Sequence, residues 1–187
     1  MLKRLFDFIV SFIGLIFVSP ILVCIAILIK REDGGPVFYR GLRIGLDGKP
    51  FRIFKFRTMV VNAEKWGGSS TADDDPGITK VGRFLRKYKL DELPQLWSVL
   101  RGDMSFVGPR PALYNQDNLV ALRTEKGIHK ITPGITGWAQ VNGRDDLPIP
   151  IKVGYDEYYL KNRSFSFDIK IPFLTLFKTV KSEGVQH

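Results

Sequence analysis

The sequence has almost none of the side chains that build disulfides, zinc sites or thiol nucleophiles. It contains one cysteine, Cys24, and two histidines, His129 and His187. A disulfide needs a second cysteine, and a tetrahedral zinc site needs several Cys or His ligands. A metal in this protein would therefore be held by oxygen ligands, which favours Mg2+, with Mn2+ as the alternative.

One long segment has almost no charge, although the chain carries a net charge of +9. Between Leu5 and Ile29 only Asp7 is charged. A helix of about 25 residues spans about 37 Å, enough to cross a hydrocarbon core of ~30 Å. The run is too long for a signal peptide and no small-residue cleavage site follows it. We therefore predict that residues 1–31 form a permanent membrane anchor and that residues 32–187 form one globular domain.

The flanks of this segment carry cations at both ends, whereas a spanning helix usually has them on its cytoplasmic side only. They are Lys3, Arg4, Lys30 and Arg31. Ser19 and Pro20 lie a little past the middle, where proline removes a helical N–H and bends the axis. A re-entrant helix that returns to its own face fits both features. An ordinary spanning helix with a tolerated proline is the alternative.

The rest of the chain predicts an α+β fold that is mainly helical. Aromatic or aliphatic residues alternate with cations on both sides of Asp47-Gly48, which is typical of a β-hairpin. Residues 78–102 have helical spacing, and Pro94 indicates that a new helix begins near it. Helices are also expected over 112–126 and 151–162. The ending, 165–184, is expected to lie in the membrane interface as an amphipathic helix or to cap the core.

Cations gather in three segments of the sequence, residues 1–31, 40–57 and 80–89. A phosphorylated substrate, an anionic membrane surface and nucleic acid all suit such charge, and a solvated surface explains many lysines. Because no nucleic-acid motif is present and the anchor holds the domain against a bilayer, we expect no nucleic-acid partner.

The acidic pair Asp91-Glu92 ends the most basic segment and allows two interpretations. Acidic residues near Pro94 stabilise the start of a helix, because they interact favourably with the positive end of the helix dipole and accept hydrogen bonds from N–H groups of the first turn. Alternatively, an ionised carboxylate beside bound phosphates attacks phosphorus as a nucleophile. We expect the cations upstream, including Arg86, to favour the charged form of Asp91.

Three longer stretches weigh on this choice: "FRIFKFRTM", "GRFLRKYKLDELPQLWSVLRGDMSFVGPRP" and "TPGITGWAQVNGR". Together with the apolar run and its Ser-Pro break, they resemble the monotopic phosphoglycosyl transferases, the bacterial sugar transferases that begin glycan assembly on polyprenyl phosphate. The resemblance covers essentially the whole chain, in order. It is to the small members of the family, in which a re-entrant helix breaks at a Ser-Pro pair matching Ser19-Pro20.

The resemblance implies roles for individual residues. It makes Asp91 the nucleophile that attacks the β-phosphate of a UDP-sugar, and it gives Glu92 a supporting role toward the metal or a proton. The residues implied to bind phosphate or nucleotide are Arg86, Arg110, Arg144, Lys55 and Arg57. Asp156, together with Asp91, is implied to lie near the magnesium ion.

The predicted activity is transfer of a sugar-1-phosphate from a UDP-sugar to undecaprenyl phosphate, with release of UMP. A covalent aspartyl-phosphosugar intermediate is expected. We expect the enzyme to lie on the cytoplasmic face of the bacterial inner membrane. It would act before the glycosyltransferases that extend an exopolysaccharide, O-antigen or glycoprotein glycan. Two alternatives use the same features: a membrane-tethered hydrolase of polyprenyl diphosphates, and a non-catalytic scaffold for glycan assembly.

Overall fold

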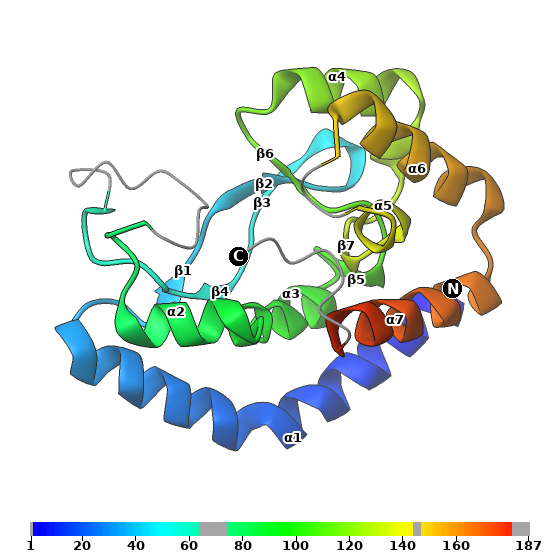
Figure 1. Ribbon diagram of the computed structural model, residues 1–187. Coiled ribbons are helices and arrows are strands. Elements are labelled where there is room, and N and C mark those ends of the chain that lie inside the picture. The colour runs from blue at the N-terminus through cyan, green and yellow to red at the C-terminus, as the bar shows by residue number, and fades with distance from the viewer. Residues whose placement is uncertain (1, 64–74, 144–146, 181–187) are drawn as a thin grey trace. The chain divides into compact units, whose positions relative to one another are not determined.

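The structure is a computed structural model that describes residues 2–63, 75–143 and 147–180 (Figure 1). Its contacts divide the chain into two compact units. The first unit is drawn from Met1–Ile9, Leu42–Arg52 and Ser98–Gln186, and the second unit is drawn from Val10–Gly41 and Ile53–Trp97. Helices dominate and the strands are short, which confirms an α+β fold with a long apolar N-terminal helix.

That helix, α1, runs from Leu2 to Asp33. It is long and apolar enough to cross a membrane, and only 11% of its most apolar stretch is buried. It is therefore unlike the core helix of a soluble protein, whose apolar residues are mostly covered. The helix contributes residues to both units and continues past residue 31. The expected boundary between anchor and catalytic domain stays a prediction.

The Ser-Pro pair near the middle of α1 has a specific local geometry. Pro20 lacks the N–H that would bond to the carbonyl oxygen of Ile16. The hydroxyl of Ser19 donates to that oxygen instead, at 2.8 Å. Serine therefore satisfies the acceptor that proline leaves open, and the ribbon of α1 changes direction near its middle (Figure 1).

In the first unit, β2 (Leu42–Ile44), β3 (Pro50–Arg52) and β6 (Ala112–Leu113) form an antiparallel sheet in the order β3-β2-β6. The 3-10 turn Leu46–Gly48 joins β2 to β3. Its Asp47 and Gly48 have φ angles of 55° and 72°, the positive values that such a turn requires. The hairpin predicted around Asp47-Gly48 is confirmed.

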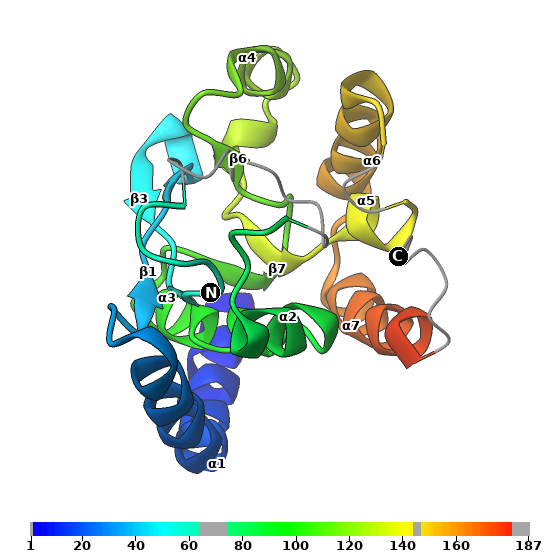
Figure 2. The same ribbon diagram turned by 60° about the vertical axis from the view of Figure 1, so that its left-hand side comes forward.

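The first unit also holds a parallel pair of strands, β5 (Ser105–Val107) and β7 (Gly134–Thr136), which the sequence analysis did not predict. Helices α4 (Asp117–Glu125), α5 (Trp138–Val141), α6 (Ile149–Asn162) and α7 (Phe165–Val180) complete it, with the 3-10 turn Ile128–Lys130. Figure 2 shows α5 lying between α6 and α7. One core cluster of this unit consists of Val107, Ile131, Val141, Tyr159 and Ile171, and another consists of Ala112, Leu119, Ile128 and Val153.

The first turns of α1 belong to this unit through polar contacts. Arg4 donates to the carbonyl oxygens of Val99 and Leu100, at 2.5 Å and 2.7 Å, and so satisfies acceptors in the last turn of α3 (Gln95–Arg101). Asp7, the one charge in the apolar run, is 3% exposed and accepts from the backbone N–H of Phe106. The start of the predicted anchor is thus held by protein contacts.

In the second unit, β1 (Phe38–Tyr39) pairs antiparallel with β4 (Lys55–Phe56). The helical pattern over 78–102 forms three pieces: α2 (Lys80–Lys87), the 3-10 turn η3 (Leu90–Glu92) and α3. Lys89, with φ of 57°, ends the first piece, and α3 begins directly after Pro94. Figure 1 shows α2 alongside the C-terminal half of α1, where Ile25 and Ile29 pack with Phe56 and Leu85.

Candidate active site

The acidic pair lies on the 3-10 turn η3, in the second unit. Asp91 is 9% exposed, and its Oδ1 has no hydrogen-bond partner among the described residues. A buried carboxylate oxygen without a partner is costly in a folded protein, and such atoms are concentrated where a substrate or an ion binds. Asp91 is therefore the strongest candidate for a reacting group in this unit.

The electrostatic environment of Asp91 has opposing contributions. Burial raises the pKa of Asp91, and the neighbouring Glu92 also raises it, whereas Lys55, Lys89 and Arg86 lower it. The cations upstream act in the expected direction, but burial outweighs them and the net shift is upward. The sequence analysis expected the cations to favour the charged form, which they do, but it did not include the effect of burial.

Glu92 faces a different partner from Asp91. Its Oε1 accepts from the Nζ of Lys55 on β4, at 2.5 Å, and both side chains are largely buried. The two acidic residues therefore differ in their environment. Asp91 Oδ1 has no hydrogen-bond partner among the described residues, whereas Glu92 forms an ion pair with Lys55. Lys55 therefore lies beside the acidic pair, as predicted, although its binding of substrate phosphate stays a prediction.

Arg86 is placed by a close approach between α2 and the segment that follows β4. The backbone of Gly82 lies against Thr58, where a Cβ would meet the Thr58 carbonyl oxygen at 2.1 Å. Only glycine allows this packing. One turn further along α2, the Nε of Arg86 donates to the hydroxyl of Thr58 at 3.0 Å. The structure thus brings Arg86, Lys55 and the acidic pair together in one unit.

Arg57 lies in that unit too, but its guanidinium has protein partners. It donates to the carboxylate of Asp33 and to two backbone carbonyl oxygens, and it is 8% exposed. Its predicted role in binding substrate is untested.

Arg110 lies in the first unit, between Pro109 and Pro111, on the segment that links β5 to β6. The backbone there is held from both sides. The carbonyl oxygen of Pro109 accepts from Gly134 N–H at 2.9 Å, and that of Arg110 accepts from the Nη1 of Arg123 at 2.8 Å. Arg110 and Arg123 line a pocket with His129, Ile44 and other residues of this unit. Among the described residues of this lining there are two arginines and no carboxylate.

Asp156, predicted to lie near magnesium, forms a buried ion pair with Arg123. Its Oδ2 accepts from the Nε and Nη2 of Arg123 at 2.9 Å and 2.6 Å, and the two residues are 2% and 7% exposed. Burial raises the pKa of Asp156, against the opposing effect of Arg123. The sequence analysis did not single out Arg123. An arginine inside the helix predicted over 112–126 was the available signal.

A divalent cation would find few ligands in the described part of the chain, where no group of three His, Cys, Asp or Glu side chains is placed to hold one. Magnesium commonly binds through one or two carboxylates and completes its shell with water and substrate phosphates. The unpartnered Oδ1 of Asp91 fits that use. Arg144, predicted to lie near the nucleotide, falls outside the described residues.

A long apolar helix and a buried carboxylate among cations suit an enzyme that acts on phosphates at a membrane. The comparisons with known proteins agree. Residues 1–182 match the model of the family described as bacterial sugar transferase, and the chain belongs to that family. It is a transferase.

Among relatives, the chain is 44% identical to a Bacillus subtilis protein named "Uncharacterized sugar transferase EpsL", over 99% of this chain and 90% of that protein. It is also 44% identical to the UDP-glucose:undecaprenyl-phosphate glucose-1-phosphate transferase of Escherichia coli, over 95% of this chain and 40% of that protein. For the undecaprenyl-phosphate galactose phosphotransferase of Salmonella typhimurium, the identity is 41%, with 96% and 40% covered. The chain thus spans about two fifths of the length of the latter two.

Proposed function

We propose that this protein transfers a sugar-1-phosphate from a UDP-sugar to undecaprenyl phosphate and releases UMP. The names of several relatives describe this type of reaction, with different sugars. The observation that carries the proposal in this chain is Asp91, a buried carboxylate with an unpartnered oxygen beside Lys55 and Arg86.

In the proposed mechanism, an oxygen of Asp91 attacks the β-phosphorus of the UDP-sugar. The bond between that phosphorus and the bridging oxygen breaks, and UMP leaves with the electron pair. The sugar-1-phosphate stays on Asp91 as an acyl phosphate. A phosphate oxygen of undecaprenyl phosphate then attacks the same phosphorus, which restores the carboxylate. One difficult transfer between two anions becomes two easier steps.

The side chains around Asp91 position and stabilise charge in these steps. Lys55 and Arg86, which belong to the same unit as Asp91, would stabilise the negative charge of the transferring phosphoryl group. For Arg110, in the other unit, we propose phosphate binding through its planar fork, as the family resemblance implies. Magnesium, held by Asp91 and by the substrate phosphates, would neutralise part of the diphosphate charge. Glu92, bound to Lys55, would keep that ammonium in place. We place the enzyme on the cytoplasmic face of the inner membrane, with α1 as a re-entrant anchor.

The decisive experiment separates the two steps. Purified enzyme in detergent is mixed with a panel of UDP-sugars and Mg2+, without a lipid acceptor. We expect a burst of UMP stoichiometric with enzyme, a matching mass increase on the peptide that contains Asp91, and loss of both signals in Asp91→Asn. UMP release only after undecaprenyl phosphate is added would contradict the covalent intermediate. Release of inorganic phosphate from a polyprenyl diphosphate, with no sugar phosphate transferred to undecaprenyl phosphate, would indicate the alternative hydrolase.

A further inference from the structure

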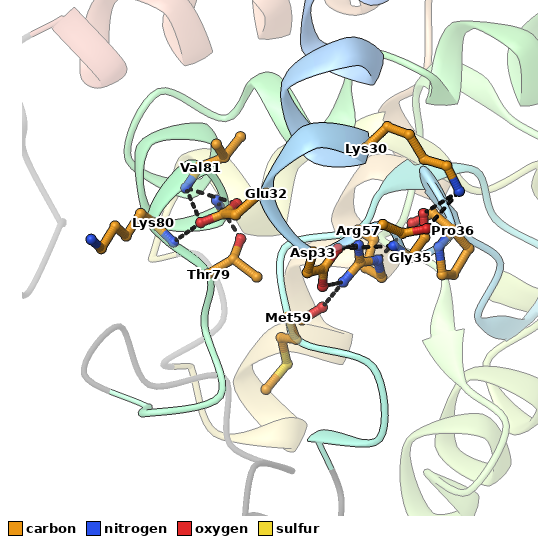
Figure 3. Close-up of polar contacts among 12 residues, drawn as sticks. Lys30, Glu32, Asp33, Gly35, Pro36, Arg57, Met59, Thr79, Lys80 and Val81 are labelled. Carbon is orange, nitrogen blue, oxygen red and sulfur yellow. Dashed lines mark hydrogen bonds and ion pairs between the residues drawn. The ribbon is translucent and has the colours of Figure 1, made fainter.

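The last turn of α1 carries two adjacent carboxylates, Glu32 and Asp33, that the proposed mechanism does not use. Both belong to the second unit, and each binds a segment far away in the sequence (Figure 3). Figure 3 shows the two side chains diverging from the end of the helix, Glu32 toward α2 and Asp33 toward Arg57. The end of the predicted anchor is therefore attached at two points.

The first attachment is a bidentate ion pair. Arg57 donates from Nη2 to Oδ1 of Asp33 at 2.5 Å and from Nη1 to Oδ2 at 2.6 Å. The same guanidinium donates to the carbonyl oxygens of Pro36 and Met59, each at 2.6 Å. Four of its five N–H groups are thus used within the protein. A lysine could not reproduce this arrangement, because it lacks the planar fork.

The second attachment is a helix cap supplied from another helix. Glu32 accepts from the backbone N–H of Lys80 at 2.7 Å and from that of Val81 at 3.3 Å. The own cap of α2, Thr79, accepts from Gly82 N–H at 2.9 Å. N–H groups in the first turn of a helix have no acceptor within the helix. Glu32 supplies that acceptor together with a charge of the favourable sign.

Both attachments hold segments that contact the Asp91-Glu92 pair or directly precede it in the sequence. Thr58, next to Arg57, accepts from Arg86, and Lys55, two residues before Arg57, binds Glu92. On the other side, α2 ends at Lys87, only a few residues before Asp91 on η3. The segments that Glu32 and Asp33 hold are therefore those that flank the nucleophile.

We propose that Glu32 and Asp33 are positioning residues, which link the end of the anchor helix to the segments that hold the Asp91-Glu92 pair. The expected loss of reaction rate in variants of Glu32 and Asp33 rests on the proposed function. The expected change in the stability of residues 89–92 rests on geometry alone. The two consequences are tested separately, so that failure of one is distinguishable from failure of the other.

The structural consequence needs no substrate. Hydrogen–deuterium exchange of detergent-solubilised protein is compared for wild type, Glu32→Gln, Glu32→Ala and Asp33→Asn. We expect faster exchange at the first turn of α2 in Glu32→Ala, extending to residues 89–92, and a smaller change in Glu32→Gln, whose amide oxygen still accepts. Glu125→Ala, an exposed carboxylate of α4, is the control with equal charge change. Unchanged exchange at residues 89–92 in both Glu32→Ala and Asp33→Asn would overturn the inference, whatever reaction the protein performs.

The kinetic consequence is a loss in kcat at nearly constant KM. A misplaced nucleophile slows the chemical step, and displacements of this kind cost on the order of 10- to 100-fold. We expect this loss in the rate of the UMP burst for Asp33→Asn and Glu32→Ala, with the KM for the UDP-sugar nearly unchanged. Asp33→Glu, which keeps the charge, should recover part of the rate. Glu125→Ala, the exposed carboxylate on α4 in the other unit, serves as the control here too.

The outcomes are distinct. A wild-type protein that releases no UMP from any UDP-sugar contradicts the proposed function, and the exchange data still decide the positioning role. An active wild type whose Asp33→Asn and Glu32→Ala variants keep the full burst rate contradicts positioning. The fraction of folded protein at the assay temperature is taken from the thermal unfolding curve. If that fraction falls as much as the rate does, both residues have a purely structural role, and the inference is also overturned.

Discussion

The buried pair of Arg123 and Asp156 allows a sharp test of what Asp156 does. Asp156→Asn keeps the size of the side chain and removes the negative charge that lies 2.6 Å from Nη2 of Arg123. Arg123 is 7% exposed, so its guanidinium cannot regain water without a rearrangement. Breaking a buried ion pair from one side leaves an uncompensated charge and costs ~3–5 kcal/mol.

The expected effect is large enough to measure by thermal unfolding. For a chain of this size, 1 kcal/mol moves the midpoint by ~2–4 °C, so we expect Asp156→Asn to unfold roughly 6–20 °C below wild type. Glu157→Gln is the matched control on the same helix. Glu157 pairs with Lys126 and Lys161 at the surface, where ion pairs contribute little, and its loss should leave the midpoint close to that of wild type.

A double variant separates stability from activity. Arg123→Met with Asp156→Leu removes both charges and should recover most of the stability that Asp156→Asn loses. Methionine cannot donate to the carbonyl oxygen of Arg110, however, so the position of Arg110 is not restored and transfer should stay slow. The reasoning would be refuted if Asp156→Asn unfolded at the wild-type midpoint and instead needed more Mg2+ for half-maximal activity. Asp156 would then be a metal ligand, as the family resemblance implied.

Four further predictions concern the site and the anchor. Arg110→Lys should lose most of the transferase activity, because an ammonium cannot reproduce a bidentate fork; near-normal turnover would make Arg110 structural. EDTA should abolish activity, and added Mg2+ or Mn2+ should restore it. The acid limb of kcat/KM should lie above the usual aspartate pKa of ~3.9, because burial raises the pKa of Asp91. In the proposed mechanism the ionised form is the nucleophile, so activity should fall as the pH drops through that raised pKa. Cysteines introduced near residues 2 and 32, with Glu32 itself left in place, should be labelled from the same side of the membrane; labelling from opposite sides would support a spanning helix.

Features that depend on neighbouring residues were predicted well. The positive φ angles at Asp47 and Gly48 follow from turn chemistry, and the hairpin formed where the sequence placed it. The long apolar helix was predicted equally well. The helical pattern over 78–102 gave the right type of structure but missed the break at Lys89, because a left-handed lysine has no local signature of its own. That break places Asp91 on a short 3-10 turn and not inside a longer helix.

Within the candidate site, the sequence identified the residue types, and long-range contacts determined their partners. Nothing near Arg57 in the sequence indicates that Asp33 binds it, since the two are separated by 24 residues. The same holds for Arg123 and Asp156, which are 33 residues apart. The parallel pairing of β5 with β7 is also a contact between distant segments, and short strands leave little periodicity to detect.

The sequence by itself determined the chemical inventory: oxygen ligands for any metal, an apolar helix with a Ser-Pro break, and acidic residues beside a basic segment. These follow from composition and from local backbone preferences. The tertiary structure decided which carboxylate keeps an unpartnered oxygen, because burial depends on what packs around a residue. Asp91 is buried in its unit, and its Oδ1 has no hydrogen-bond partner among the described residues, whereas arginines bind the carboxylates of the buried Asp156 and the exposed Asp33.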